Sequence, residues 1–327
     1  MYERGETLAV GVAVETVRGT FAPATDYVRM REPATIQTLV ETVDVKESRP
    51  TGLARDSKVI TMKKVEGDIA LNMRFRTIGY FFKSLLGGWS SATEAGQTVV
   101  YRHTGSLNTA VLQPTLSLSM ARGSYLHKQV PGAVVTKLAL NAAIDDVING
   151  SVTIKGLTET TTTNFTPAFA STDYIAPHQM VTVKIAANTA GLGAALPMVL
   201  NDFGIEFDRP NDERTNVSAI TPVDFVAKLL NISGKFVMDK TDDTYKDFAE
   251  ANTVRAMSIT ITNSAQSIGT GINPSLVITL PNVSLKTSEA RPLDAIVTEE
   301  ITFEANYDET AASGVTVSLL NEKLNYV

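Results

Sequence analysis

The chain has 327 residues, 43% hydrophobic residues and a formal net charge of −6. This length exceeds what one typical hydrophobic core supports and suits two domains. The chain has no cysteine, which excludes a disulfide framework and thiol chemistry. Its first residues carry charges where a secretory leader needs an apolar run, and no stretch of 18 apolar residues occurs. We therefore expect a soluble protein, made in the cytoplasm, that contacts no membrane.

The first part of the chain predicts a long hairpin. Residues 1–27 are interpreted as an N-terminal arm with a short strand and turn. Residues 33–47 are rich in Thr and Val, which favour a strand, and Lys58–Arg74 alternates as a second strand, with Gly67 as a candidate bulge. The connecting loop should project well beyond the sheet. Its tip residues are Arg49, Pro50, Thr51, Gly52, Leu53, Arg55 and Asp56.

A short amphipathic helix follows this hairpin. Five apolar residues recur with helical spacing after Thr77, which can cap the start of the helix, and Gly87 can end it. Burial of each apolar side chain contributes about 1.5–3 kcal/mol. So short a helix is unstable alone, so we expect it to lie on a sheet, with Lys83 on the opposite face. The predicted core residues are Ile78, Phe81, Phe82, Leu85 and Leu86.

A second copy of this strand–helix unit occurs downstream. The offset from Gly67 to Gly234 is 234 − 67 = 167, whereas the offset from Pro131 to Pro281 is 281 − 131 = 150. The difference, 167 − 150 = 17, indicates an insertion after the first helix, near residues 90–97. We interpret the chain as mainly β, with two tandem β-sandwich domains, each flanked by one short helix. The domains span residues 28–165 and 197–327, with a linker at 166–196.

The two halves differ in charge. Residues 28–165 hold 16 Lys and Arg against 11 Asp and Glu, a balance of +5, whereas residues 197–327 hold 10 against 19, a balance of −9. Two explanations fit this asymmetry: neutral sequence change on solvent-exposed surfaces, or electrostatic complementarity between neighbouring subunits. The second helix has a weaker apolar stripe and starts among acidic residues. Its acids are Asp242, Asp243, Asp247 and Glu250, a candidate acceptor for the basic hairpin tip.

No catalytic constellation is recognisable in the sequence. The three histidines, His103, His127 and His178, lack metal-ligand spacing, and we interpret each as a loop or surface residue. No serine lies in a nucleophile elbow. We therefore expect no enzyme activity, no metal and no cofactor.

Several short motifs, taken in order, resemble the major tail tube proteins of long-tailed bacteriophages. The first is Gly11-x-x-x-Glu15-Thr16-x-x-Gly19-Thr20, followed by a turn that contains proline. Further matches are residues 66–68, 86–87, 125–136, 280–283 and 303–308. The chain departs from the pattern at Arg18, where an aromatic residue is usual, and in its weak second helix.

This resemblance implies a structural virion protein of the phage tail. Such proteins form rings that stack into a hollow tube, and one sheet of each domain joins its neighbours in a β-barrel around the lumen through which DNA leaves. A hairpin loop at the place of residues 48–57 reaches the adjacent ring. The implied partners are other copies of the chain, the tape measure protein and the tail terminator, with DNA passing without specific binding.

Two domains in each chain suggest a ring of three chains with pseudo-sixfold symmetry. The alternative is a capsid-decorating or pilin- or adhesin-like β-sandwich binding module.

Overall fold

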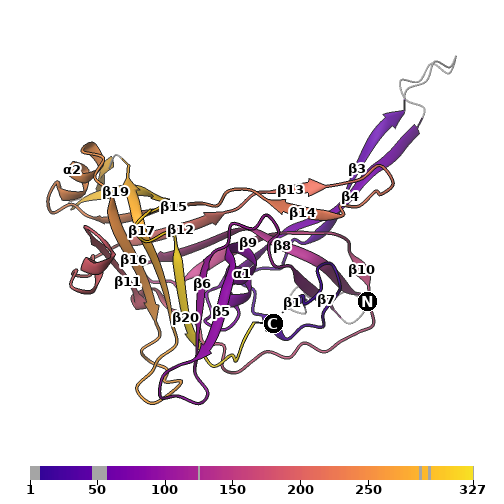
Figure 1. Cartoon of the computed structure of the whole chain (residues 1–327), viewed down its shortest axis with the longest axis horizontal. Coiled ribbons are helices and arrows are strands. Elements are labelled where there is room, and N and C mark those ends of the chain that lie inside the picture. Colours follow the sequence, from indigo (N-terminus) through magenta and orange to yellow (C-terminus); the bar gives the residue numbers. More distant parts are fainter. Residues whose placement is uncertain (1–7, 46–56, 124–125, 287–288, 294–295, 327) are drawn as a thin grey trace.

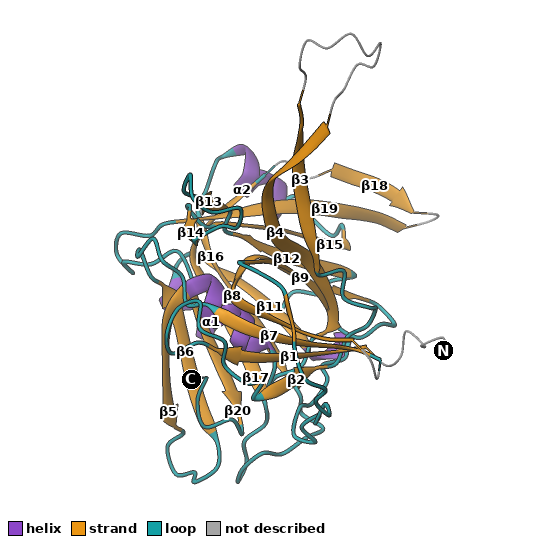
Figure 2. Ribbon diagram, turned by 90° about the vertical axis from the view of Figure 1, so that its right-hand side faces the viewer, coloured by secondary structure: helices purple, strands orange, loops and turns teal. Residues whose placement is uncertain are grey.

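The computed structural model describes residues 8–45, 57–123, 126–286, 289–293 and 296–326. The fold is mainly β, as predicted, with two α-helices in these ranges. Figure 1 shows the strands stacked in layers, with a long hairpin extending away from the body. Figure 2 shows the same hairpin from the side, at the opposite end from the loop between β5 (Gly87–Thr93) and β6 (Tyr101–Leu107).

A central sheet runs through the whole chain, and each strand in it pairs antiparallel with the next. Its far edge is the end of β17 (Ser275–Leu285) continued by β18 (Glu289–Leu293). In order, the other strands are β3 (Gln37–Val45), β4 (Ser57–Asn72), β9 (Asn149–Gly156), β8 (Leu126–Ala143), β12 (Asp202–Asp208), β15 (Asn231–Asp239) and β19 (Ile296–Asn306).

The same order of pairing occurs twice in the central sheet. We call β3, β4, β9 and β8 the first unit, and β12, β15, β19 and β17–β18 the second unit. Gly67 pairs with Ile154 in the first unit, and Gly234 pairs with Phe303 in the second. The last pair of strands in each unit also shifts register by one residue. In the first unit, the β9–β8 pair shifts between Val135 and Lys137. In the second unit, the pairing of β19 shifts between β17 and β18.

Further strands pack against the central sheet in both halves. The strand β1 (Leu8–Val14) pairs with β2 (Asp26–Val28) and β7 (Leu116–Arg122), and β11 (Val181–Ala186) pairs with β16 (Arg255–Thr262). The segments assigned from sequence to an arm and a linker therefore each contribute a paired strand. In the arm, the apolar run 9–14 is buried where β1 pairs with the distant strand β7.

The insertion after the first helix is longer than the sequence offsets suggest. Leu118 pairs with Val130 in the first half, and Met257 pairs with Leu280 in the second. Val130 and Leu280 are separated by 280 − 130 = 150 residues, the same offset as Pro131 and Pro281. Leu118 and Met257 are therefore equivalent positions. The offset of the pair itself is 257 − 118 = 139, so the extra length in the first half is 167 − 139 = 28. The extra length in the second half, between β16 and β17, is 150 − 139 = 11. The first insertion includes the β5–β6 hairpin, and β6 pairs with β20 (Thr316–Asn321).

The helix α1 (Ile78–Leu86) is the buried centre of the first half. All five predicted core residues are at most 1% exposed. Thr77 does not cap the helix with its side chain. Instead, Asp173 accepts hydrogen bonds from the backbone N–H groups of Arg76 (3.0 Å) and Thr77 (3.3 Å). Gly87 ends the helix with a positive φ of 83°, where a Cβ would be strained.

The outer face of α1, which carries Lys83, is also covered. The C-terminal segment returns over the helix, and the Lys83 ammonium donates to the backbone carbonyl of Tyr326. Burial lowers the pKa of Lys83. A Cβ on Gly79 would lie 2.3 Å from the Tyr326 ring, so the two are in close contact. Lys83 therefore lies opposite the predicted core residues, but the C-terminal segment covers this face and leaves the side chain only partly exposed.

Three local expectations also need correction. The bulge in β4 lies beside Thr61 rather than at Gly67, where a Cβ would collide with the Ile36 backbone at 2.4 Å. His103 and His127 are buried, not surface residues. Burial lowers the pKa of His103 to about 4, and its ring bonds Ser91 (2.7 Å) and Asn321 (3.0 Å).

Candidate assembly surfaces

The central sheet ends in two edge strands, β3 and β18. In the described residues, β3 pairs only with β4, and β18 pairs only with β19. An edge strand presents a row of N–H and C=O groups that can pair with another chain. The first and last strands of this sheet are therefore candidate surfaces for self-association.

The junction between the two units shows how such an edge can be joined. The β8–β12 pairing runs from Ala143 with Asp202 to Lys137 with Asp208. Beside the junction, the ring of Phe207 packs edge-on against Phe82 of α1, with centroids 5.4 Å apart. The Arg209 guanidinium donates to the Leu85 carbonyl at the end of α1 (2.8 Å). The second unit therefore completes the packing of the first helix.

A second contact between the halves is the hairpin of β13 (Asn211–Arg214) and β14 (Asp224–Ala227). It leaves the second unit and reaches β4, as Figure 1 shows. The backbone N–H of Lys63 donates to the Ile220 carbonyl (2.6 Å), and the Glu213 carboxylate lies 3.2 Å from Lys64 and 3.0 Å from Lys155. Some acids of the second half therefore already form ion pairs with lysines of the first half of the same chain.

Arg18 explains one departure from the family pattern. Its guanidinium lies 2.5 Å from the Asp224 carboxylate and donates to the Phe225 carbonyl (3.0 Å) and to the Gln113 carbonyl. An aromatic residue at this position could not make these bonds. Arg18 therefore holds the β13–β14 hairpin against the first half.

Glu15 gives the opening motif a structural role that spacing alone did not reveal. Its carboxylate is 8% exposed and accepts from the hydroxyls of Thr115 (2.6 Å) and Ser117 (2.7 Å). It also accepts from the backbone N–H groups of Gly19 (2.7 Å) and Gly132 (2.7 Å). Gly132, with φ of 63°, lies where β8 passes from its pairing with β7 to the central sheet. Glu15 therefore fixes the turn after β1 and the bend of β8 together.

The projecting β3–β4 hairpin exposes apolar side chains in its described part. Val40, Val43, Val59 and Ile60 are between 42% and 56% exposed. An extended hairpin with apolar residues in water is a candidate contact surface. The seven tip residues predicted from sequence, Arg49 to Asp56, lie outside the described residues.

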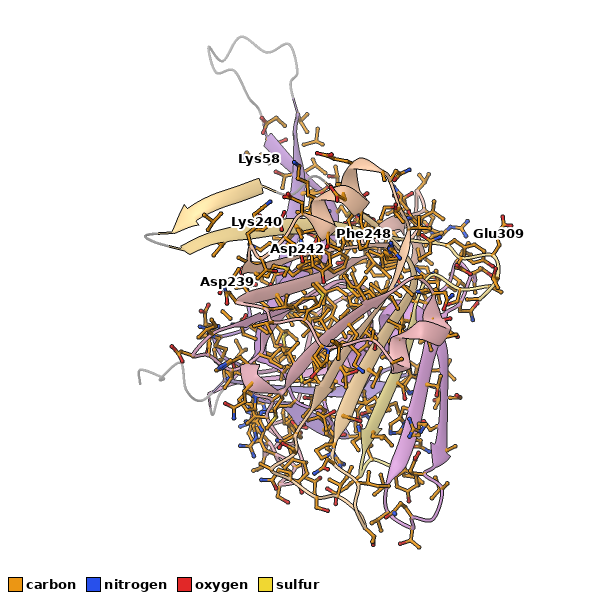
Figure 3. The ribbon with its side chains drawn as sticks, turned by 90° about the vertical axis from the view of Figure 1, so that its left-hand side faces the viewer. Lys58, Asp239, Lys240, Asp242, Phe248 and Glu309 are labelled. Atoms are coloured by element: carbon orange, nitrogen blue, oxygen red, sulfur yellow. The ribbon has the colours of Figure 1, made fainter. Side chains whose placement is uncertain are left out.

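The predicted acidic acceptor lies around α2 (Thr244–Glu250), where Tyr245 and Phe248 are only partly buried. Two of its acids have local partners: Asp242 accepts from the N–H of Thr244 (2.9 Å), and Asp243 is 2.6 Å from Lys240. Glu250 is 3.7 Å from Lys246. Figure 1 shows α2 and the projecting β3–β4 hairpin on opposite sides of the body, and Figure 3 labels Asp242 beside α2 and Lys58 on the hairpin. Its role as an acceptor remains a prediction.

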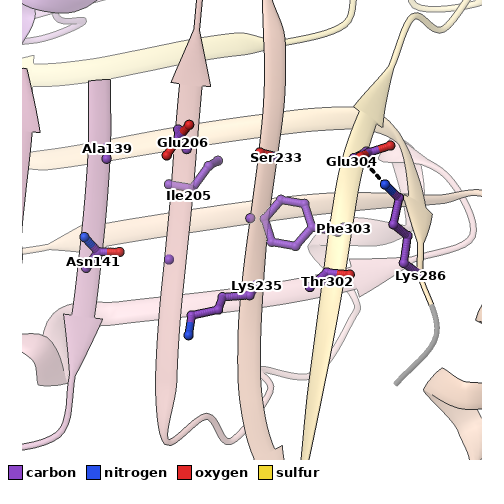
Figure 4. Close-up of a pocket in the computed structure, with 12 residues that line it drawn as sticks. Ala139, Asn141, Ile205, Glu206, Ser233, Lys235, Lys286, Thr302, Phe303 and Glu304 are labelled. Atoms are coloured by element: carbon purple, nitrogen blue, oxygen red, sulfur yellow. Dashed lines mark hydrogen bonds and ion pairs between the residues drawn. The ribbon is translucent and has the colours of Figure 1, made fainter. Parts of the chain in front are cut away.

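One face of the central sheet is packed on the core. The other face is open over the second unit, whereas the β13–β14 hairpin reaches over Lys64 and Lys155 of the first unit. Leu138, Leu140, Phe203, Ile205 and Phe303 are buried on the covered face. The alternate positions carry charged and small polar side chains, among them Glu206, Ser233, Lys235, Thr302 and Glu304, which line a groove of about 480 Å³ (Figure 4). The open face is therefore wet and carries both signs of charge.

The described residues contain no cluster of three or more His, Asp or Glu able to hold a metal ion. No helix in this part of the chain is both long and apolar enough to span a membrane.

Comparison with known families points to one group. The model of a family described as phage tail tube protein matches residues 5–317, nearly the whole chain. No individual curated protein matches the sequence. The family match covers both units of the central sheet, the two described helices and the β3–β4, β5–β6 and β13–β14 hairpins. The chain therefore belongs to the phage tail tube protein family and is a structural protein of the virion tail.

Proposed function

We propose that three copies of this chain close into a ring and that the rings stack into the tail tube through which DNA is ejected. The observation that carries this proposal is the β8–β12 junction. It joins two equivalent units within one chain. The two free edges of the sheet match the two strands of this junction: β3 is equivalent to β12, and β18 is equivalent to β8. Pairing of β18 with β3 of the next chain repeats the junction between chains. Three chains then supply six units around a closed barrel without free edges.

The repeat predicts a register for this pairing between chains. Gln37 occupies the place of Glu206, since their partners Glu66 and Ser233 are equivalent, with an offset of 233 − 66 = 167. The offset of β12 from β3 is thus 206 − 37 = 169. Positions in β17 lie 150 residues after their equivalents in β8. This offset also holds in β18, because the one-residue register shift within β8 is matched by the one-residue shift between β17 and β18. Ala139 pairs with Glu206 within the chain, so Glu289, its equivalent in β18, should pair with Gln37 of the next chain.

Cysteine cross-linking tests this register directly. The chain has no cysteine, so the double variant Gln37→Cys with Glu289→Cys carries the only thiols. Directly paired residues of antiparallel strands have Cβ atoms about 4.5–5.5 Å apart, close to the disulfide range. Mild oxidation of assembled protein should give covalent dimers and trimers on a denaturing gel, and should give almost none at concentrations where the chain is monomeric.

The matched control shifts one partner by a single residue. In Thr38→Cys with Glu289→Cys, the thiol moves to the other face of β3, because side chains alternate along a strand. This variant should cross-link at least tenfold less. Rings that form while both variants stay uncross-linked, or cross-link equally, would refute the pairing.

The remaining assignments follow from ring formation. The projecting β3–β4 hairpin is proposed to contact a neighbouring ring with its basic tip, and the acids around α2 are proposed partners for that tip. Tape measure and terminator proteins are proposed to contact the lumen and the end of the tube. This role is structural rather than enzymatic.

A further inference from the structure

We infer that residues 322–326, which follow β20, form a latch that closes the first half of the chain, and that acid releases this latch. The strand β20 pairs with β17 of the second half and with β6 of the first, and the chain then returns beside α1 (Figures 1 and 2). The latch therefore reaches the first half from a strand that also belongs to the second. This inference concerns the single chain and does not depend on ring formation.

Tyr326 is the first anchor of the latch, and its side chain is 0% exposed. Its ring lies edge-on to Tyr80 of α1 and to His103 of β6, with ring centroids 4.9 and 4.8 Å away. Its hydroxyl donates to the Arg76 carbonyl (2.6 Å) and accepts from the Asn321 amide (2.7 Å). The buried hydroxyl therefore has both a donor and an acceptor partner, which defines a specific seat for this residue.

Lys323 is the second anchor of the latch. Its ammonium donates to the Asp26 carboxylate of β2 (2.6 Å). This carboxylate is 3% exposed and also accepts from the Arg76 guanidinium (2.6 Å) and the Tyr80 hydroxyl (2.5 Å). Between the two anchors, Leu324 is 61% exposed. Two side chains therefore hold a segment whose middle faces water.

His103 lies against the latch, is 0% exposed and has both ring nitrogens bonded. The Asn321 amide nitrogen donates to the Phe75 carbonyl (2.8 Å), so the amide oxygen faces Nε2 of His103 (3.0 Å). Nε2 therefore carries the proton, and Nδ1 accepts from the Ser91 hydroxyl (2.7 Å). A second proton on this ring would place a positive charge in a buried site.

Acid favours release of the latch because the imidazole gains a proton more readily in water than in this site. Burial and the charge of Lys323 lower the pKa of His103 from 6.5 to about 4. The released state therefore binds more protons than the closed state between these two values. The ratio of released to closed latch should rise as the pH falls through this window, by a factor of about 300 in total.

The other charged groups do not reverse this effect. Burial raises the pKa of Asp26, but hydrogen bonds from its three donors outweigh burial and lower it, so the second anchor is lost only at still lower pH. Burial raises the pKa of Asp173, which acts in the opposite sense, but its carboxylate caps α1 and does not bond the latch. The remaining charged groups at the latch are Arg76, Lys83 and Glu322.

Trp89, the only tryptophan of the chain, reports the state of the latch. Its ring lies edge-on to Tyr326 (5.7 Å) and is stacked on His103 (6.1 Å). The experiment titrates the full chain from about pH 7 to about pH 4. We expect the Trp89 emission to move to longer wavelength and acrylamide quenching to rise at least twofold, while the far-UV circular dichroism stays constant.

Two substitutions test the trigger and the seat separately. His103→Gln keeps an N–H donor and an oxygen acceptor but does not titrate here, so the fluorescence midpoint should fall by at least one pH unit. Gly79→Ala should release the latch at neutral pH, because the added Cβ would lie 2.3 Å from the Tyr326 ring. Alanine is favoured over glycine inside a helix, so α1 itself should persist.

Matched controls make the same changes where nothing is displaced. A Cβ on Gly193 has no atom within 4 Å, so Gly193→Ala should keep the emission of the parent at every pH. Leu324→Ala truncates an exposed side chain between the two anchors and should behave in the same way. Tyr326→Ala, which removes an anchor, should instead show the released emission at neutral pH.

The outcomes decide the inference in either direction. An unchanged acid midpoint in His103→Gln, or the parent's emission in Gly79→Ala, would overturn it. Circular dichroism that changes together with the emission would also overturn it, because acid would then unfold the protein as a whole. If His103→Gln does not fold, hydrogen exchange of the parent at about pH 7 and pH 5 decides instead. Corrected for intrinsic rates, peptides covering α1 should lose protection at least threefold more than peptides covering β16, and equal losses would contradict the latch.

Discussion

Phe82→Asp should abolish the folded protein. The Phe82 side chain is 0% exposed and packs against Phe207 across the junction of the two units. Loss of a buried Phe side chain alone costs about 3–5 kcal/mol, and an unpaired carboxylate in that space costs several more. Domains are stable by only about 5–15 kcal/mol in total. We expect insoluble protein, no cooperative thermal transition in any soluble fraction, and no rings in electron micrographs.

The control places the same charge on an exposed apolar residue. Val217 is fully exposed, so Val217→Asp should change the free energy of unfolding by less than about 0.5 kcal/mol. Phe82→Leu, which keeps an apolar side chain, should remain soluble and lose about 1 kcal/mol in urea unfolding. A soluble Phe82→Asp variant with the parent's midpoint would contradict the packing of α1 at the junction.

Glu15→Ala should destabilise the first half by several kcal/mol. The substitution leaves two buried hydroxyls and two backbone N–H groups without their shared acceptor. Hydrogen bonds to charged groups contribute about 1.5–3 kcal/mol each, although the hydroxyls can rotate to recover part of this. Urea unfolding should show the loss, and hydrogen exchange should be faster in peptides covering Gly19 and Gly132.

Two comparisons separate this effect from a simple loss of charge. Glu15→Gln keeps one oxygen acceptor and should lose less than half as much stability as Glu15→Ala. Glu32→Ala removes an exposed carboxylate and should stay within about 0.5 kcal/mol of the parent. A Glu15→Ala variant as stable as Glu32→Ala would show that the carboxylate does not hold the turn and the bend of β8.

The sequence predicted the features that depend on short-range periodicity. The alternation around Gly67 corresponds to the strand β4. The apolar stripe from Ile78 to Leu86 corresponds to the buried helix α1. These patterns are local, so a short window of sequence contains them. The equivalence of Gly67 and Gly234 was also visible, because both occupy the same place in a strand that precedes a helix.

Features that depend on distant partners were not predictable from spacing. The helix pattern placed Lys83 opposite the core residues, but it could not reveal that Tyr326, far along the chain, contacts it there. The same holds for Asp173, which replaces Thr77 as the helix cap, and for His103, which is buried by the C-terminal segment. The first insertion appeared too short because the sequence offsets show only the net of two insertions, one in each half.

The number of chains in the ring is the most direct test of the account. The assembled protein should be imaged by electron microscopy, with class averages of single rings, and the rings should be weighed by native mass spectrometry. The account predicts three full chains in each ring, with six similar lobes seen down the axis. Rings of six full chains, or protein that stays monomeric at every concentration tested, would contradict it.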